Sequence, residues 1–208
     1  MIAPDVMIVF ITASVALALA PGPDNIFVLT QSALHGRVAG IMVTLGLCLG
    51  VLVHTSLVAL GVAVIFQTSA LSFAVLKTVG GCYLLYLAWK AFGARPAVIN
   101  GGRGAGLSPI RLIGRGVIMN VTNPKVAIFF LAFLPQFADP ARGPVTPQIF
   151  IFGGVFVLSA LVVFGAIAWS AGFLGAWLAR TPRAQVVMNR IAGGIFAALA
   201  LRLFLAQR

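Results

Sequence analysis

Hydrophobic positions along the chain gather in long runs that are separated by short polar segments. Each run holds about twenty residues or more, which is enough for a helix to cross a hydrocarbon core of roughly 30 Å. The runs lack the two-residue alternation of a membrane barrel, so helices are favoured. The pattern predicts an all-α integral membrane protein with six transmembrane helices, at about 6–34, 39–66, 69–92, 114–137, 148–178 and 187–205.

Two of these predicted helices, the first and the fourth, are interrupted. The interruptions read APGPDN and NVTNPK. Proline removes a backbone donor and clashes with the preceding turn, so neither helix can continue unbroken. The candidate helix-break residues are Pro21, Gly22, Pro23 and Pro124, and the polar residues beside them are Asp24, Asn25, Asn120, Asn123 and Lys125.

The two halves of the chain resemble each other. KTVGGCY at 77–83 matches RIAGGIF at 190–196, and the two proline breaks align in the same order. We therefore expect one transmembrane transporter domain, 1–208, built as a 3+3 repeat: repeat A at 1–93, a linker at 94–110 and repeat B at 111–208. Three crossings leave the second repeat inverted, and inverted repeats with interrupted helices are typical of a transporter's binding site.

Composition and charge agree with a membrane location. Hydrophobic residues make up 61% of the chain and charged residues only 8%, against about 25% charged in soluble domains. The net charge of +11 comes from thinly spread basic residues, which do not form a nucleic-acid-binding patch. Most lie in the odd-numbered connections, which predicts that these are cytoplasmic and that both termini are periplasmic. The first residues, MIAPD, lack the positive charge of a signal peptide, so we expect the first helix to be retained.

Asp24 and Lys125 carry the chemistry of the candidate site. They have opposite charges, occupy matching positions of the two halves, and are flanked by asparagines. A carboxylate and an ammonium beside exposed helix ends suit a zwitterionic amino acid, and a proton and a substrate ammonium would compete for one carboxylate. Three simpler interpretations stay open: Asp24 as a helix cap, the asparagines as interhelical hydrogen-bonding groups, and Lys125 as a snorkelling side chain.

Other chemistries find little support. The chain contains no glutamate, and its histidines and cysteines have no metal-ligand or nucleophile–base spacing, so we expect no enzyme, no cofactor and no metal site. His54 either relays protons or bonds a neighbouring helix. Gly46 and Gly50 form a G-x-x-x-G, which permits close packing inside the protein or in a homodimer. An exporter of another small solute or of a metal cation is the main alternative.

The motifs APGPDN, GGCYLLYLAWKAF and NVTNPK resemble those of the lysine exporter family, and most closely its homoserine/threonine resistance (LysE/RhtB) branch. The resemblance covers nearly the whole chain. It implies a bacterial inner-membrane exporter of amino acids, driven as a secondary antiporter by the proton gradient. It also implies that the residues of the two breaks are signature positions of the family. It does not identify the amino acid that is exported.

Overall fold

The computed structural model describes residues 2–20, 22–62, 70–94 and 107–205, and the regular elements in these ranges are all helical. Pro21 and most of the predicted linker lie outside the described residues. The α-helices are α1 (Pro4–Leu19), α2 (Pro23–His35), α3 (Arg37–Leu57), α5 (Ala70–Phe92), α6 (Pro109–Val121), α7 (Pro124–Ile128), α8 (Val145–Arg180) and α9 (Pro182–Leu205). Short π-helical and 3-10 segments are η1 (Val58–Val62), η2 (Phe129–Phe133), η3 (Leu134–Phe137) and η4 (Pro140–Arg142).

The protein is a multi-pass membrane protein. Among the described residues, three helices are long and apolar enough to cross a bilayer, at Arg37–Gly61, Val145–Ser170 and Arg183–Leu205. Two bent pairs raise the number to five if each pair is one span: α1 with α2, bent by 60°, and α6–η3, bent by 53°. Helix α5 is not among these candidates, so the arrangement of six spans in two repeats stays a prediction.

The bends fall at the two places where the sequence predicts interruptions. Helix α1 ends at Leu19, and α2 starts at Pro23 after an extended Gly22 with φ −178°. Helix α7 starts at Pro124, where Asn123 is the N-cap residue. Proline at the first position of a helix needs no amide donor there, so each proline ends one helical segment and begins another.

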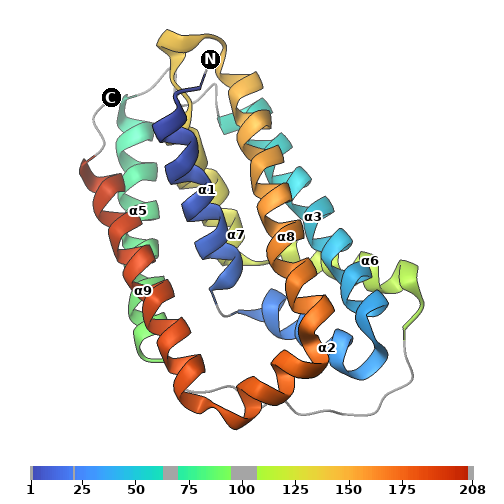
Figure 1. Cartoon of the computed structure of the whole chain (residues 1–208). Coiled ribbons are helices and arrows are strands. Elements are labelled where there is room, and N and C mark those ends of the chain that lie inside the picture. The colour runs from blue at the N-terminus through green and yellow to red at the C-terminus, as the bar shows by residue number, and fades with distance from the viewer. Residues whose placement is uncertain (1, 21, 63–69, 95–106, 206–208) are drawn as a thin grey trace.

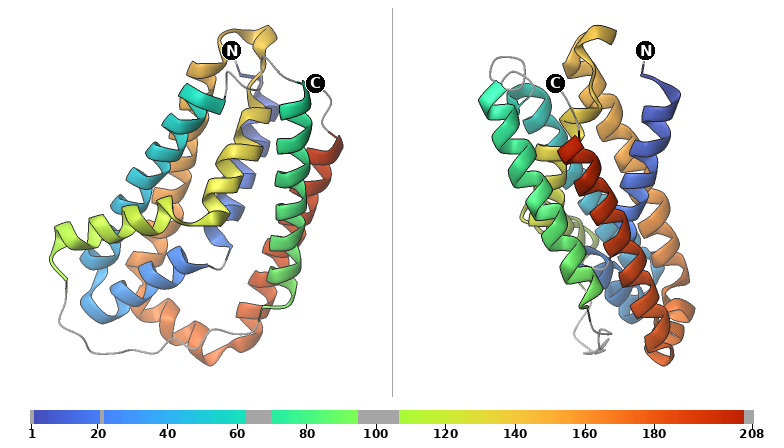
Figure 2. Two further views of the ribbon diagram at one scale, coloured as in Figure 1. Left: turned by 180° about the vertical axis from the view of Figure 1, so that it is seen from behind. Right: turned by 90° about the vertical axis from the view of Figure 1, so that its left-hand side faces the viewer.

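The long helices run side by side, whereas α2 and α6 cross the bundle (Figures 1 and 2). Helix α3 packs on both α6 and α8, α5 packs on α9, and α1 packs on α8. Both termini lie at the same end of the bundle (Figure 1). At the two breaks the polar side chains of Asp24, Asn123 and Lys125 are buried, whereas Pro23 and Pro124 are exposed.

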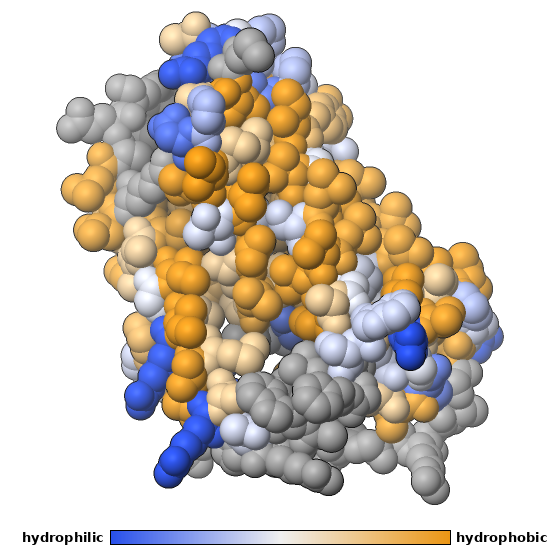
Figure 3. Space-filling view, in the orientation of Figure 1, coloured by the Kyte–Doolittle hydropathy of each residue, from blue (hydrophilic) through white to orange (hydrophobic). Residues whose placement is uncertain are grey.

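A cluster of phenylalanines fills the core between the breaks and the end that carries the termini. Its rings come from α1, η2, η3 and α8, with centroids 4.8 Å apart for Phe10 and Phe152 and 4.8 Å apart for Phe133 and Phe137. Large apolar side chains also cover much of the face in Figure 3. Among the exposed apolar residues of the protein are Leu60 and Val162, at 73% and 72% exposed. Hydrophilic residues gather towards the two ends of the face in Figure 3. An outer surface of this kind suits lipid rather than water.

Candidate functional site

The break between α6 and α7 lies directly against the break between α1 and α2. The Nζ atom of Lys125 donates hydrogen bonds to the carbonyl oxygens of Leu17 and Ala20, at 3.1 and 3.0 Å. These carbonyls belong to the last turn of α1 and to its C-cap residue, where a helix leaves its acceptors without amide partners. A cation at this end also matches the negative end of the helix dipole. Lys125 is buried, so it does not snorkel to the surface.

Asp24 contacts the start of α7 through hydrogen bonds made by Asn123. The Nδ2 atom of Asn123 donates to Oδ2 of Asp24 at 3.0 Å, and its Oδ1 accepts from the backbone amide of Lys125 at 3.0 Å. Asp24 is only 2% exposed and makes no side-chain cap on α2, whose N-cap residue is Gly22. The capping role considered for Asp24 therefore belongs to Asn123, on the other broken helix.

Asp24 and Lys125 come together without a direct ion pair. Their contacts run through Asn123 and through the carbonyls of α1. For comparison, Asp139 and Arg142 pair directly at 3.1 Å on the exposed surface. Opposite charges near each other in a buried site partly offset the cost of removing each from water, and the lack of a direct ion pair leaves both groups able to take new partners.

The two charges line one small cavity together with Asn120. The other lining side chains are apolar and come from α1, α3, α7 and α8. The cavity volume is about 10 Å³, which is room for about one water molecule. The structure is therefore a closed form, and any larger solute requires the helices around this cavity to separate.

Several buried oxygen atoms in this region have no hydrogen-bond partner. They are Oδ1 of Asp24, Oδ1 of Asn25 and Oδ1 of Asn120. The amide nitrogen of Asn25 is satisfied, because it donates to the carbonyl of Ala18 at 2.6 Å. Buried polar groups normally find a partner, and one without a partner calls for an explanation. The missing partners are all donors, so a group with several N–H bonds, such as an ammonium, would satisfy them.

Glycines allow this close packing: Gly22 is a predicted helix-break residue, whereas Gly50 was not among the predicted site residues. A Cβ atom on Gly22 would lie 3.2 Å from Nζ of Lys125, and a Cβ on Gly50 would lie 2.6 Å from Cβ of Asn120. Gly46 packs against Gly116 on α6, so this G-x-x-x-G is used within the chain. The spacing was visible in the sequence, but the helix on which it packs was not.

His54 also contacts the site from α3. Its Nε2 atom lies 3.2 Å from the carbonyl oxygen of Asn120, which can only accept a hydrogen bond. Its ring lies 5.8 Å from that of Phe130. This carbonyl stands in the last turn of α6, beside the break, so His54 supports the interrupted backbone there. The interhelical hydrogen bond considered for His54 is therefore present.

Gly50→Ala is expected to lower transport by at least about tenfold, because the added methyl group displaces Asn120 from the cavity and a misplaced site residue is costly. Gly154→Ala is the matched control, since a Cβ atom on Gly154 would have no neighbour within 4 Å. Flux measured in vesicles at equal protein levels checks this. Equal flux in the two variants would contradict a role for Asn120.

Apolar helices that bend at two breaks with buried polar side chains suit a membrane transporter. The chain belongs to the LysE type translocator family, whose model matches residues 15–207. It is 32% identical to the homoserine/homoserine lactone efflux protein of Salmonella typhimurium over 193 residues, with 90% of each chain covered.

Two further relatives cover the chain almost completely. The chain is 30% identical to an uncharacterized membrane protein of Vibrio cholerae over 203 residues, which cover 97% of this chain and 98% of that protein. It is 26% identical to the leucine efflux protein of an Enterobacter species over 195 residues, which cover 93% and 92%. No solved structure matches the chain.

Proposed function

We propose that this protein exports an amino acid across the bacterial inner membrane and that it binds the zwitterion at Asp24, Lys125 and the neighbouring asparagines. Family membership and two relatives named as efflux proteins support export of amino acids. The observation that carries the site is the buried cavity that one carboxylate and one ammonium share. A zwitterion needs both charges at short range, and its own two charges leave the filled site electrically balanced.

The unpartnered oxygens give the proposed substrate its orientation. Its ammonium group donates to Oδ1 of Asp24 and to Oδ1 of Asn120, which lack donors in the closed form. Its carboxylate accepts from Lys125, which must then release the carbonyls of Leu17 and Ala20. Substrate binding would in this way loosen the contact between the two broken helices. Binding of the substrate would therefore shift the equilibrium from the closed form towards an open one.

The six-helix, 3+3 arrangement is part of this proposal. Packing supports it, because the helices that would be repeat mates contact each other: α3 with α8, and α5 with α9. The matching glycine pairs Gly80-Gly81 and Gly193-Gly194 each contain a glycine that faces an aromatic ring of the other helix. A Cβ on Gly81 of α5 would meet the ring of Phe204 on α9, and one on Gly193 of α9 would meet the ring of Phe92 on α5.

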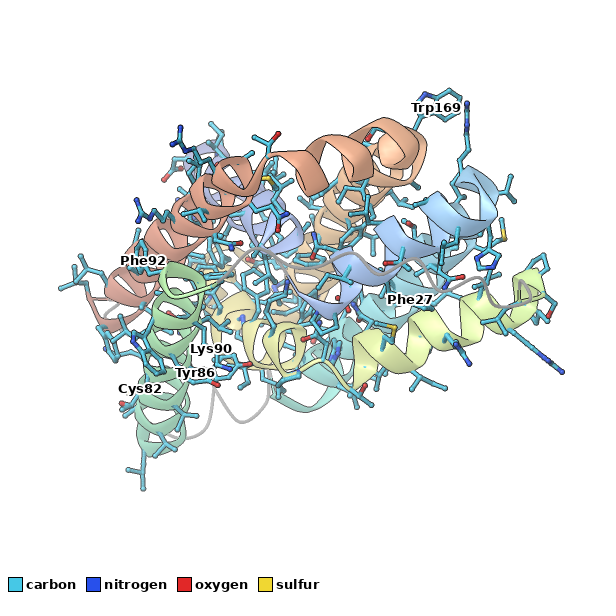
Figure 4. The ribbon with its side chains drawn as sticks, turned by 90° about the horizontal axis from the view of Figure 1, so that it is seen from below. Phe27, Cys82, Tyr86, Lys90, Phe92 and Trp169 are labelled. Carbon is cyan, nitrogen blue, oxygen red and sulfur yellow. The ribbon has the colours of Figure 1, made fainter. Side chains whose placement is uncertain are left out.

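We also propose that both termini face the periplasm. The termini share one end of the bundle (Figure 1), and the sequence places most basic residues in connections at the other end. Arg37 lies there with its guanidinium 4.3 Å from the centroid of the Trp169 ring. Figure 4 shows Trp169 at the edge of the bundle, and tryptophan is enriched where a membrane meets water.

The energy source in this proposal is the proton gradient, used by antiport. A proton and the substrate ammonium compete for Asp24, so the carboxylate returns protonated after it releases the amino acid. Reconstituted protein should exchange amino acids across a bilayer, and a pH gradient should drive their accumulation in inverted vesicles. Uptake that ignores a collapsed pH gradient would overturn the coupling, and absence of any amino-acid exchange would overturn the function. Including divalent cations in the panel tests the metal-exporter alternative.

A homodimer remains a separate proposal. The face of α3 that bears Gly46 is covered by α6 of the same chain, so a second copy would have to pack elsewhere. Cross-linking in native membranes measures this directly.

A further inference from the structure

We infer that the exported amino acid has an uncharged, aliphatic side chain and that Ala160 on α8 sets its size. This inference rests on the proposed function and deepens it, because neither the family nor the chemistry of the two charges distinguishes neutral substrates from basic ones. It is carried by the apolar lining of the cavity and by the distribution of carboxylates in the chain.

The site has one carboxylate to offer a substrate. The chain contains three acidic residues in all. Asp5 is exposed in the first turn of α1, and the half-exposed side chain of Asp139 is paired with Arg142. Once the substrate ammonium occupies Asp24, a second positive charge on a basic side chain would lie buried without a counter-ion, which is strongly unfavourable.

The remaining lining accepts an aliphatic group. Phe156, Ala160 and Phe164 follow one another at intervals of four residues, so they share one face of α8, and all three line the cavity. Leu47 and Val51 on α3 line it as well. No second charge comes from α8 or α3 among these lining side chains, so this wall favours a methyl or isobutyl group over an ammonium or a carboxylate.

Ala160 is the small residue between two large ones. The ring of Phe156 is held by Phe129 and Phe130, with centroids 5.6 and 5.0 Å away, so it cannot easily move aside. Ala160 itself is buried and contributes only a methyl group to the cavity lining between the two phenylalanines. We place the substrate side chain against this residue, once the surrounding helices separate.

The test uses the purified full-length protein in proteoliposomes, with counterflow of labelled leucine, alanine, lysine and glutamate. Wild-type protein should exchange leucine and alanine at least about tenfold faster than lysine or glutamate. Ala160→Leu should lower leucine exchange about tenfold more than alanine exchange, since a lost methylene-sized space discriminates by roughly 10–200-fold. Ala160→Gly, which removes volume and so avoids overpacking, should shift the ratio towards leucine.

The controls separate specificity from folding. Ala166→Leu changes an exposed alanine of the same helix and should leave the substrate profile as it is. Ala160→Asp should raise lysine exchange relative to leucine, because it supplies the missing counter-ion. Lysine exchange as fast as leucine in the wild type, or an equal loss of all substrates in Ala160→Leu with no shift in Ala160→Gly, would overturn the inference. Absence of exchange for every amino acid would instead overturn the proposed function.

Discussion

Replacing Asp24 by asparagine is expected to abolish transport while the protein still inserts into the membrane at its normal level. The amide has nearly the same shape and its oxygen can still accept the hydrogen bond from Asn123. What the variant loses is the negative charge that we assign to the substrate ammonium and to the proton. Removing one partner of a desolvated charge pair costs about 2–5 kcal/mol, which corresponds to a loss of at least about thirtyfold.

Uptake of labelled amino acid into inverted vesicles, normalised to the amount of inserted protein, measures this effect. Asp139→Asn is the matched control, because the side chain of Asp139 is 47% exposed and its partners are its neighbours Arg142 and the backbone amide of Ala141. Its flux should be unchanged. Flux of the Asp24→Asn variant within twofold of the wild type would remove Asp24 from the proposed mechanism.

The positions of the helix breaks could be predicted from the sequence because the effect of proline on a helix is local. Pro23 and Pro124 forbid a continuous hydrogen-bond ladder whatever surrounds them. The bends of 60° and 53° at these positions follow from that rule. The apolar runs likewise depend on composition alone, although the structure extends several of them. Helix α8 covers Val145–Arg180 where we expected 148–178, and α9 covers Pro182–Leu205 where we expected 187–205.

The hydrogen-bond partners of the charged side chains could not be predicted from the sequence. Lys125 binds backbone carbonyls of α1, and a carbonyl has no sequence signature, since every residue carries one. Asp24 and Asn123 are 99 residues apart, and only the packing of one break on the other brings them together. The sequence therefore indicated which residues matter more readily than what each one touches.

The side chains that line the cavity could not be predicted from the sequence either. Phe156, Ala160 and Phe164 lie inside a run that is apolar on every side, so periodicity cannot show which face turns inward. Gly50 was visible as part of a G-x-x-x-G, yet its contact with Asn120 depends on the crossing of α3 and α6. Packing geometry, rather than residue chemistry, determines both features.

Lys125→Met is expected to abolish transport and, unlike Asp24→Asn, also to destabilise the folded protein. The variant leaves the buried carbonyls of Leu17 and Ala20 without their donor, at about 1–3 kcal/mol for each. It also removes the cation near the buried carboxylate of Asp24, and this loss adds to the destabilisation although the two groups form no direct ion pair. Thermal unfolding of the purified variant in detergent should show a clearly lower Tm.

The double variant Asp24→Asn/Lys125→Met separates these two contributions. It removes both charges, so only the loss of the two carbonyl contacts remains, and its Tm should lie between those of Lys125→Met and the wild type. Transport should stay absent, because neither end of the zwitterion has its partner. A double variant no more stable than Lys125→Met would show that the two charges are energetically independent. In that case Lys125 serves the end of α1 alone, and the shared site for a zwitterion loses its physical basis.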